Sequence, residues 1–419
     1  MTDPAVPSLA AGVDAGPAPD PTQPELRLPP RQWVKANLFR TPADGIITVV
    51  VGSLLAYFGY RFLRFVLVTA EWEIVRRNLT TFMVGRYDRT QLWRPSAAVS
   101  IGAAGAGLLA GLLQGVAGPH RSRARTVRSV AGRTWPLALL VVALLALTRS
   151  LGPLLLVVID IALILGCRAL GRRLRGRGRT AGFVAVALVP VAMVIVLSSF
   201  GGVPWGGWGG LLLNVFLAAA GISLCFPLGL VLALGRRSNL PVARVLSVAY
   251  IELFRGVPLV ALILMGVLTL GFFVPQGLAP GDIVRVIAVF TVFTSAYVAE
   301  IVRGGLQSVP RGQTEAAKAL GLSPTRITAF IVLPQALRAS IPALVGQFIS
   351  LFKDTSLVFV VGLPEVLRVA FIIPQQADFR GQGRLTETLV FAMFVFWVGS
   401  YTMSRESQRL ERRFGVGER

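Results

Sequence analysis

The sequence has little of the residues that build metal, disulfide and nucleotide sites. It contains one histidine, two cysteines and three lysines in 419 residues. Cys167 and Cys225 both lie inside apolar runs, where a thiol usually behaves as a small hydrophobic side chain, so no disulfide or metal framework is predicted. His120 stands in a basic loop without a carboxylate or cysteine neighbour. We assign it no role.

A phosphate-binding loop is also missing. The GxxxxGK[ST] motif places a lysine directly after a glycine, and none of Lys35, Lys318 and Lys353 follows a glycine. The chain is therefore predicted to bind no nucleotide cofactor, and any ATP hydrolysis must occur on another polypeptide.

Long apolar runs are what the sequence has in excess. It is 54% hydrophobic with a mean hydropathy of +0.68, and runs of about 20 apolar residues recur from residue 45 onward, each long enough to cross a bilayer. The predicted fold is an all-α polytopic transmembrane bundle. The ten predicted spans are about 45–68, 96–117, 135–149, 151–170, 182–199, 209–235, 245–274, 283–303, 340–362 and 387–404.

Basic residues gather in the short loops between these runs. The net charge is +22, and loops 118–134, 171–181, 236–244 and 304–339 are net basic, which predicts that they and both termini are cytoplasmic. The segment 69–95 disagrees, because it should be external yet is rich in arginine. The basic loops lack interleaved aromatic residues, so nucleic-acid binding is not predicted.

The chain divides into regions of different character. Residues 1–44 begin with a stretch rich in Pro and Ala that has no apolar core of a signal peptide, and we expect a disordered cytoplasmic tail. Residues 45–205 read as accessory transmembrane helices. Ionisable residues appear within the spans from about residue 206, so we expect function in 206–405, followed by a cytoplasmic tail at 406–419.

The longest internal loop predicted to be cytoplasmic, Ser308 to Pro342, is expected to be folded. Pro310 can open a short helix, and Gly321 suits the left-handed residue that ends it. Ser323 is expected to cap a second helix with Pro324 at its first position, which Pro334 should interrupt. Small residues on the first helix, Ala316, Ala317 and Ala319, are expected on its exposed side, where another protein can approach closely. An ordinary helical hairpin resting on the membrane surface is the alternative interpretation.

The spacing of this loop resembles the EAA loop of binding-protein-dependent ABC importer permeases. The matching positions are Glu315, Ala316, Ala317, Gly321, Ile331, Leu333 and Pro334. In that family the loop docks into a groove of a cytoplasmic ATPase, so the resemblance implies the same coupling role for residues 310–336. The strings YIELFRGVPLV, SAYVAEIVRGGLQSVPRGQ and LFKDTSLV are similar to the polar amino acid branch, and the resemblance covers about residues 206–412.

The resemblance implies a five-span permease core preceded by about five extra spans, similar to the enlarged permeases for general or acidic and amide amino acids. It also implies a multi-pass subunit of the bacterial inner membrane. The implied partners are two ATPase subunits that hold ATP and Mg, a second permease subunit or a copy of this one, and an extracytoplasmic amino acid-binding protein. No covalent chemistry is expected in this chain.

Several polar residues within the spans are candidates for function. Glu252 with Arg255, and Glu300 with Arg303, stand at i, i+3, where helical side chains can pair; they are either structural ion pairs or gating contacts. Pro258 is expected to break the span that contains the first pair. The predicted substrate pathway comprises Thr294, Ser295, Tyr297, Glu300, Lys353, Asp354, Thr355 and Ser356.

Within that set, Asp354 or Glu300 could bind a substrate ammonium group, and Lys353 could equally be a structural partner of either. Thr294, Ser295 and Tyr297 can alternatively serve as helix-packing hydroxyls. The residues from Lys353 to Ser356 are adjacent in sequence, so they cannot all face one cavity.

Two other classes of membrane protein remain as alternatives. An ion- or proton-coupled secondary transporter would need an inverted repeat with broken helices, and the halves of this sequence show no such symmetry. A membrane-embedded transferase acting on a lipid-linked donor would need clustered acids or a histidine and carboxylate pair, and the sequence shows no paired-aspartate motif.

Overall fold

The computed structural model describes residues 29–114, 139, 142, 152–174, 176–199, 201–275 and 280–414. The predicted third span, 135–149, lies almost entirely outside these residues, as do basic loop 118–134 and His120. The chain divides into two compact units, Met1–Ala70 and Glu71–Arg419, which are described separately.

The first unit consists of α1 (Pro30–Leu38), α2 (Pro42–Arg64) and the π-helical turn η1 (Phe65–Thr69). Part of the expected disordered tail is thus helical, because Pro30 occupies the first turn of α1, where its missing N–H costs nothing. Thr41 and Asp44 form a reciprocal capping box that fixes the start of α2. The stretch Pro42–Thr69 is long and apolar enough to span a membrane.

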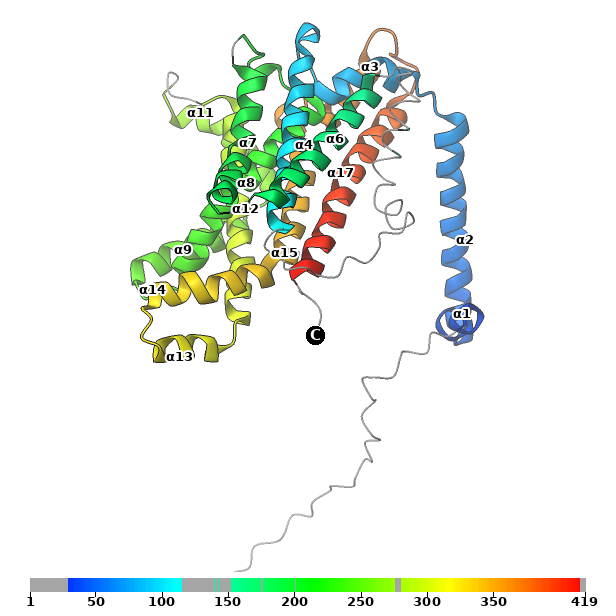
Figure 1. The fold of residues 1–419 in the computed structure, drawn as a ribbon. Helices are drawn as coiled ribbons and strands as arrows, with labels where there is room; N and C mark the ends of the chain where they lie inside the picture. Colours follow the sequence, from blue (N-terminus) through cyan, green and yellow to red (C-terminus); the bar gives the residue numbers. More distant parts are fainter. Residues whose placement is uncertain are drawn as a thin grey trace, which may run out of the picture. The chain divides into compact units, whose positions relative to one another are not determined.

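The second unit is built of helices (Figure 1). Those before the predicted core are α3 (Glu73–Val84), η2 (Arg89–Gln91), α4 (Trp93–Gln114), α6 (Gly152–Arg173), α7 (Arg177–Ser198) and η3 (Trp205–Gly207). Those of the core are α8 (Gly210–Arg236), α9 (Pro241–Gly256), α10 (Leu259–Leu264), η4 (Met265–Thr269), α11 (Leu270–Phe273), α12 (Asp282–Ser308), α13 (Arg311–Ala319), α14 (Pro324–Arg326), η5 (Ile327–Val332), α15 (Leu333–Asp354), η6 (Thr355–Val361), α16 (Val366–Ile372), η7 (Ile373–Gln375) and α17 (Leu385–Phe414).

The all-α prediction is confirmed for the described residues. Six helices in that part of the chain are long and apolar enough to cross a membrane, or up to eight if each of two bent pairs forms one span. The predicted number of ten stays a prediction. The predicted span 245–274 is broken, as expected, because α9 and the helix Leu259–Thr269 meet at 101°.

The helices α4, α6 and α7 pack through small residues. A Cβ added to Gly107 would lie 2.5 Å from the carbonyl oxygen of Ile164, and one added to Gly171 would lie 2.6 Å from that of Leu108. The glycines therefore let α4 and α6 approach backbone to backbone, as small residues do between transmembrane helices. Ser100 of α4 also donates a hydrogen bond of 2.6 Å to the Asp160 carboxylate of α6.

The basic segment 69–95 folds against the core as the amphipathic helix α3. Its apolar face packs on α16 and α17, with the rings of Phe82 and Phe391 in edge contact at 4.9 Å. Arg76 and Arg77 both bind Glu73, and these hydrogen bonds lower the pKa of that carboxyl to about 2. Arg94 donates to the last carbonyls of α7. Several of these arginines thus have defined local partners.

Figure 1 places α3 and α11 at one end of the second unit and α13 and α14 at the other. Two of the four buried apolar clusters of the described residues belong to the predicted core. One joins α8, α12 and α15 to the loop helices α13 and η5, and the other joins α8, α10, α12 and η6. The loop helices are therefore packed onto the spanning helices and are not separate from them.

Candidate functional site

The predicted coupling loop begins with a helix that is capped by its own sequence. Pro310 precedes α13, and Gly321 follows it with a φ of +74°. The amide of Leu322 donates to the carbonyl of Ala317, and that of Gly321 donates to Lys318. This pair of bonds is a Schellman motif, which requires a left-handed residue that glycine adopts without strain. The predicted end of the first helix is confirmed.

Two of the three alanines of α13 that were expected to be exposed are exposed, and one is buried. Ala316 and Ala319 are exposed, but Ala317 is 2% exposed and packs with Leu306, Ile327 and other apolar residues. The prediction that Ala317 is exposed is wrong, because a helix of nine residues must bury one face to stay attached to the core. Glu315 also lies on the exposed side.

The second helix of the loop is longer than predicted. Ser323 stands at the cap position of α14, but its side chain makes no capping bond. Pro334 does not interrupt the helix, which continues as a single unit from Pro324 to Val361. The π-helical turn Ile327–Val332 ends two residues before this proline. Its wider hydrogen-bond register removes the clash between the ring and the carbonyl one turn earlier.

A cavity of about 1070 Å³ lies between the loop and the ends of α8 and α12. One charged side chain at the end of α8 and three from α13 line it: Arg237, Arg311, Glu315 and Lys318. Because Ile327, Val332 and Leu333 line the same cavity, α13 rests on the bundle along one edge and leaves space under the other.

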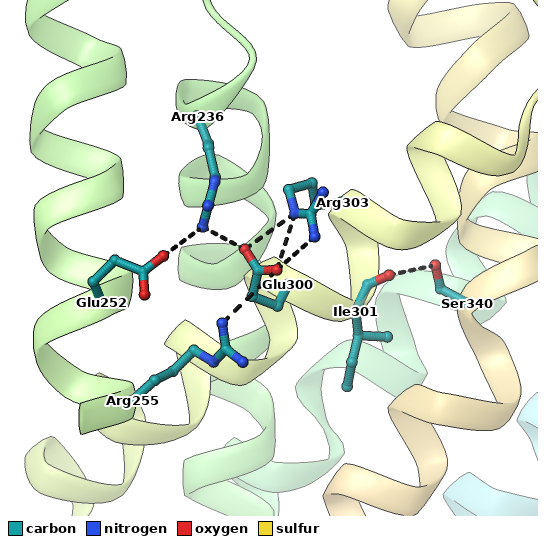
Figure 2. A network of polar contacts seen from close by, with 7 residues as sticks. All are labelled: Arg236, Glu252, Arg255, Glu300, Ile301, Arg303 and Ser340. Carbon is teal, nitrogen blue, oxygen red and sulfur yellow. Dashed lines mark hydrogen bonds and ion pairs between the residues drawn. The ribbon is translucent and has the colours of Figure 1, made fainter. Parts of the chain in front are cut away.

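Beside the loop, five charged side chains from three helices form one network (Figure 2). Its centre is Glu300 of α12, whose carboxylate is 2.5 Å from Arg236 and 2.9 Å from Arg303. Arg255 of α9 approaches the same carboxylate at 3.8 Å. The side chain of Glu300 is 16% exposed, so its charge is held by arginines and only partly by water.

The sequence predicted this network in part. The i, i+3 pair of Glu300 and Arg303 is present, but the pair of Glu252 and Arg255 is not. Glu252 instead binds Arg236 at 3.2 Å, and Arg255 turns toward Glu300. The prediction that Glu252 pairs with Arg255 is wrong, because charged side chains on neighbouring helices compete with the partner on the same helix. Arg236 was missed, since its place beside both glutamates depends on the tertiary fold.

The hydroxyls of the predicted substrate pathway lie in different surroundings. Thr294 and Ser295 are buried, and the hydroxyls of Ser295 and Tyr250 are 2.9 Å apart. Tyr297 is half-buried, with the Arg255 guanidinium 5.8 Å from its ring centre. Ser295 also donates to the Val292 carbonyl of its own helix. This bond fits the alternative prediction, in which the hydroxyl serves helix packing.

The four residues from Lys353 to Ser356 also face different ways, as adjacent helical residues must. Lys353 is exposed and lines a shallow groove of about 470 Å³ with Trp397 and Tyr401 of α17. Asp354 and Ser356 are half-buried. Thr355 is buried and accepts a hydrogen bond of 2.9 Å from Asn214 of α8.

Asn214 belongs to a buried polar cluster that the sequence did not indicate. Its amide donates to the Glu365 carboxylate at 3.2 Å, and its oxygen accepts from the amide of Val366. Glu365 also accepts from the first amides of α16. The polar residue Asn214 inside an apolar span was the available signal, but its partners lie more than 140 residues away.

Among the described residues, no group of three or more histidine, cysteine, aspartate or glutamate side chains is arranged to hold a metal ion. The geometry consists of a docked loop, a charge network and buried polar clusters.

Comparison with known proteins decides the family. Residues 225–416 match the model of the "Binding-protein-dependent transport system inner membrane component" family. The chain is 41% identical to the inner membrane amino-acid ABC transporter permease protein YhdY of Escherichia coli K12, over 62% of this chain and 72% of that protein. This chain belongs to that family.

Two further relatives show how the permease is divided. It is 42% identical to the glutamate/glutamine/aspartate/asparagine transport system permease protein BztC of Rhodobacter capsulatus, over 49% of this chain and 47% of that protein. It is 39% identical to the probable glutamine ABC transporter permease protein GlnP of Bacillus subtilis, over 49% of this chain but 92% of that protein. About half of this permease therefore corresponds to nearly the whole of a shorter one.

The family match contains both parts of the candidate site. The predicted coupling loop 310–336 and all five charged residues of the network fall between residues 225 and 416, whereas α3, α4, α6 and α7 precede the match. The permease is thus a multi-pass inner-membrane transport subunit, and the chemistry of ATP hydrolysis belongs to a separate subunit.

Proposed function

We propose that this permease imports polar L-amino acids that an extracytoplasmic binding protein delivers, with energy from a cytoplasmic ABC ATPase. The observation that carries the proposal is α13, a capped helix at one end of the bundle with Glu315, Ala316 and Ala319 exposed. Small exposed side chains permit close docking of another protein. The names of the relatives support amino acids as the cargo.

The proposal assigns a side of the membrane to each end. The loop 310–336 lies in the cytoplasm, where two ATPase subunits hold ATP and Mg, and α3 lies outside. Since α17 runs from the end that holds α3 toward the end that holds α13 (Figure 1), residues 406–419 are cytoplasmic, and the N-terminus is cytoplasmic as well. The accessory helices 45–205 precede a transport core at 206–405, which pairs with a second permease subunit or a copy of itself.

In this proposal α13 passes the motion of the ATPase to the spanning helices. Ala317 and Ile327 pack in one buried apolar cluster with residues of α12 and α15. A shift of the loop therefore moves these two helices with it. The network around Glu300 joins α8, α9 and α12 beside it. ATP-driven closure of the ATPases would therefore tilt the core between an inward-open and an outward-open arrangement.

The substrate pathway is proposed around the C-terminal end of α15. Lys353 is exposed within a helix long and apolar enough to span the membrane, and a charge there is costly unless it faces protein or water. Asp354 beside it is the stronger candidate for a substrate ammonium. Glu300 is already bound by Arg236 and Arg303, which favours a structural or gating role for it.

Disulfide crosslinking tests the proposal. With Cys167 and Cys225 replaced by serine, a cysteine at Ala316 or Ala319 should crosslink to cysteines in the groove of the partner ATPase in purified complexes. A cysteine at the buried Ala317 is the matched control and should not. Absence of crosslinks from both exposed positions, in complexes that still hydrolyse ATP, would overturn the assignment of the coupling loop.

A second measurement separates ATP-driven import from ion-coupled transport. Uptake of labelled amino acids into proteoliposomes that contain the whole complex should stop with vanadate and persist with an uncoupler. The reverse pattern would favour a secondary transporter.

A further inference from the structure

The helix α9 (Pro241–Gly256) leaves one apolar side uncovered. Val242, Val245, Leu246 and Leu253 are between 60% and 71% exposed, and Ala249 between them is exposed too. These positions are spaced at i, i+3, i+4, i+7 and i+11, so they form a single stripe along the helix.

The rest of α9 divides into two further sides. Ser247 and Ile251 are buried against the bundle. The charged residues Arg244, Glu252 and Arg255 occupy the third side, and the last two enter the network around Glu300. The helix thus has three sides, each about a third of its circumference. One packs against the bundle, one carries charged residues, and one is apolar and uncovered.

The angle of α9 fits a helix that lies along a membrane surface. It meets the following helix, Leu259–Thr269, at 101°. The break lies at Val257, which is extended because the ring of Pro258 disfavours a helical residue before it. If the following helix enters the bilayer, α9 lies close to the membrane plane, and Figure 1 shows it across the bundle at the end that holds α13.

We propose that α9 is an interfacial helix whose stripe of Val242, Val245, Leu246, Ala249 and Leu253 lies in the acyl chains of the cytoplasmic leaflet. The assignment to that leaflet rests on the proposed function, which places α13 in the cytoplasm. A helix with one apolar side, one charged side and little net hydrophobicity lies in such an interface.

Charge favours lipid as the occupant. Between residues 236 and 256 there are four arginines and one glutamate, and basic residues beside an apolar stripe attract anionic headgroups. The neighbouring helix α8 also exposes large apolar side chains in the half nearest α9, Leu224 and Val231. Both helices thus expose apolar side chains, and α8 is long and apolar enough to span the membrane.

The placement has a consequence for the network. Glu252 and Arg255 belong to the same helix as the stripe, so a change in the depth of α9 moves two of the five charged side chains around Glu300. The lipid of the inner leaflet thus acts on the segment that joins α8, α9 and α12.

Spin-label accessibility tests the proposal. Single cysteines replace Leu246 or Arg244 in a chain with Cys167 and Cys225 changed to serine, and the labelled permease is assembled with its ATPase in nanodiscs of phosphatidylcholine and phosphatidylglycerol. We expect the label at position 246 to collide with oxygen more than with a water-soluble nickel chelate, and the label at 244 to show the opposite ratio. Nickel access at 246, or loss of access to both reagents on assembly, would overturn the proposal; the second result would indicate a protein partner.

A matched pair of variants provides a functional measurement. Leu246→Glu places a carboxylate in the stripe, and Val248→Glu places one among the charged residues of the same helix. We expect Leu246→Glu to lower ATP-coupled uptake about fivefold or more, because acyl chains disfavour a carboxylate, and Val248→Glu to have much less effect. Equal effects would contradict the lipid placement. Crosslinking at Ala316 is measured in the same samples, so a failed coupling-loop assignment is recognised separately.

Discussion

The two ends of the second unit hold their polar groups in different ways. At the end near α3, Asn214, Thr355 and Glu365 are fully buried and hydrogen-bonded to one another. At the end near α13, the side chains around Glu300 are 16% to 58% exposed and are joined by ion pairs. Buried hydrogen bonds with fixed geometry resist rearrangement, whereas ion pairs that are partly solvated exchange partners at a lower cost. The molecule is thus rigid at one end and adjustable at the end where we propose that the ATPase docks.

The largest effect is expected from the turn that ends α13. Gly321→Val forces a β-branched residue into a left-handed conformation, at a cost of roughly 1–2 kcal/mol, which is about a 5- to 30-fold loss of the native turn. Beyond Gly321 and its two chain neighbours, no atom lies within 4 Å of the position of the added Cβ, so the strain is confined to the backbone. We expect ATPase binding and uptake to fall while the protein stays in the membrane.

Gly321→Asn is the control for that variant, because asparagine tolerates the left-handed conformation. Its uptake should stay near that of the unmodified chain. If both variants transport normally, the coupling role of the turn is wrong.

The pH dependence of unfolding tests the rigid end. Glu365 lies between the helices Pro324–Val361 and Val366–Gln375, and burial raises its pKa from 4.5 to about 7, against hydrogen bonds from Leu367, Arg368 and Asn214 that lower it. The folded state then binds a proton more tightly than the unfolded state. The contribution of Glu365 to stability is fully present below pH 4.5 and is lost as the pH rises to about 7.

We expect the Tm of the purified permease to decrease over this window and the decrease to be absent in Glu365→Gln. The paired substitution Glu387→Gln, at another buried carboxyl, should leave the Tm decrease of the unmodified permease in place. A flat Tm profile in the unmodified permease would show that the cluster holds an ionised carboxylate.

The smallest effects are expected within the network. Double-mutant cycles with Arg236→Gln measure its coupling to Glu300 and to Glu252 separately. The first pair is closer, at 2.5 Å against 3.2 Å, and its glutamate is less exposed. We expect a coupling energy of about 1–3 kcal/mol for the first pair and below about 1 kcal/mol for the second. Equal values would remove the distinction between the centre and the edge of the network.

How far the sequence predicted the site depends on how local each feature is. The end of α13 was predictable, because Gly321 and the residues before it determine a Schellman motif by themselves. The apolar runs likewise predicted most spans, since length and hydropathy are local properties. The coupling-loop residues and the substrate pathway stay predictions about function.

The features that were wrong or missed depend on contacts between distant segments. The predicted pair of Glu252 and Arg255 lost to Arg236, which a turn of the chain brings beside both glutamates. The interruption at Pro334 did not occur, because a π-helical turn absorbs the proline. Asn214 gave no sign of its partners, which follow α15 in the chain.

The uninterrupted helix from Pro324 to Val361 has a thermodynamic consequence. Its 38 residues extend about 55 Å at 1.5 Å per residue, so one element begins beside α13 and ends beside the polar cluster that contains Glu365. A protein that binds at one end of this helix and favours one tilt of it changes the equilibrium between the tilts. A protein that binds at the other end therefore meets a different population of the two tilts. With a binding protein outside and an ATPase inside, the factor by which nucleotide alters the affinity for the binding protein must equal the factor by which the binding protein alters the affinity for nucleotide.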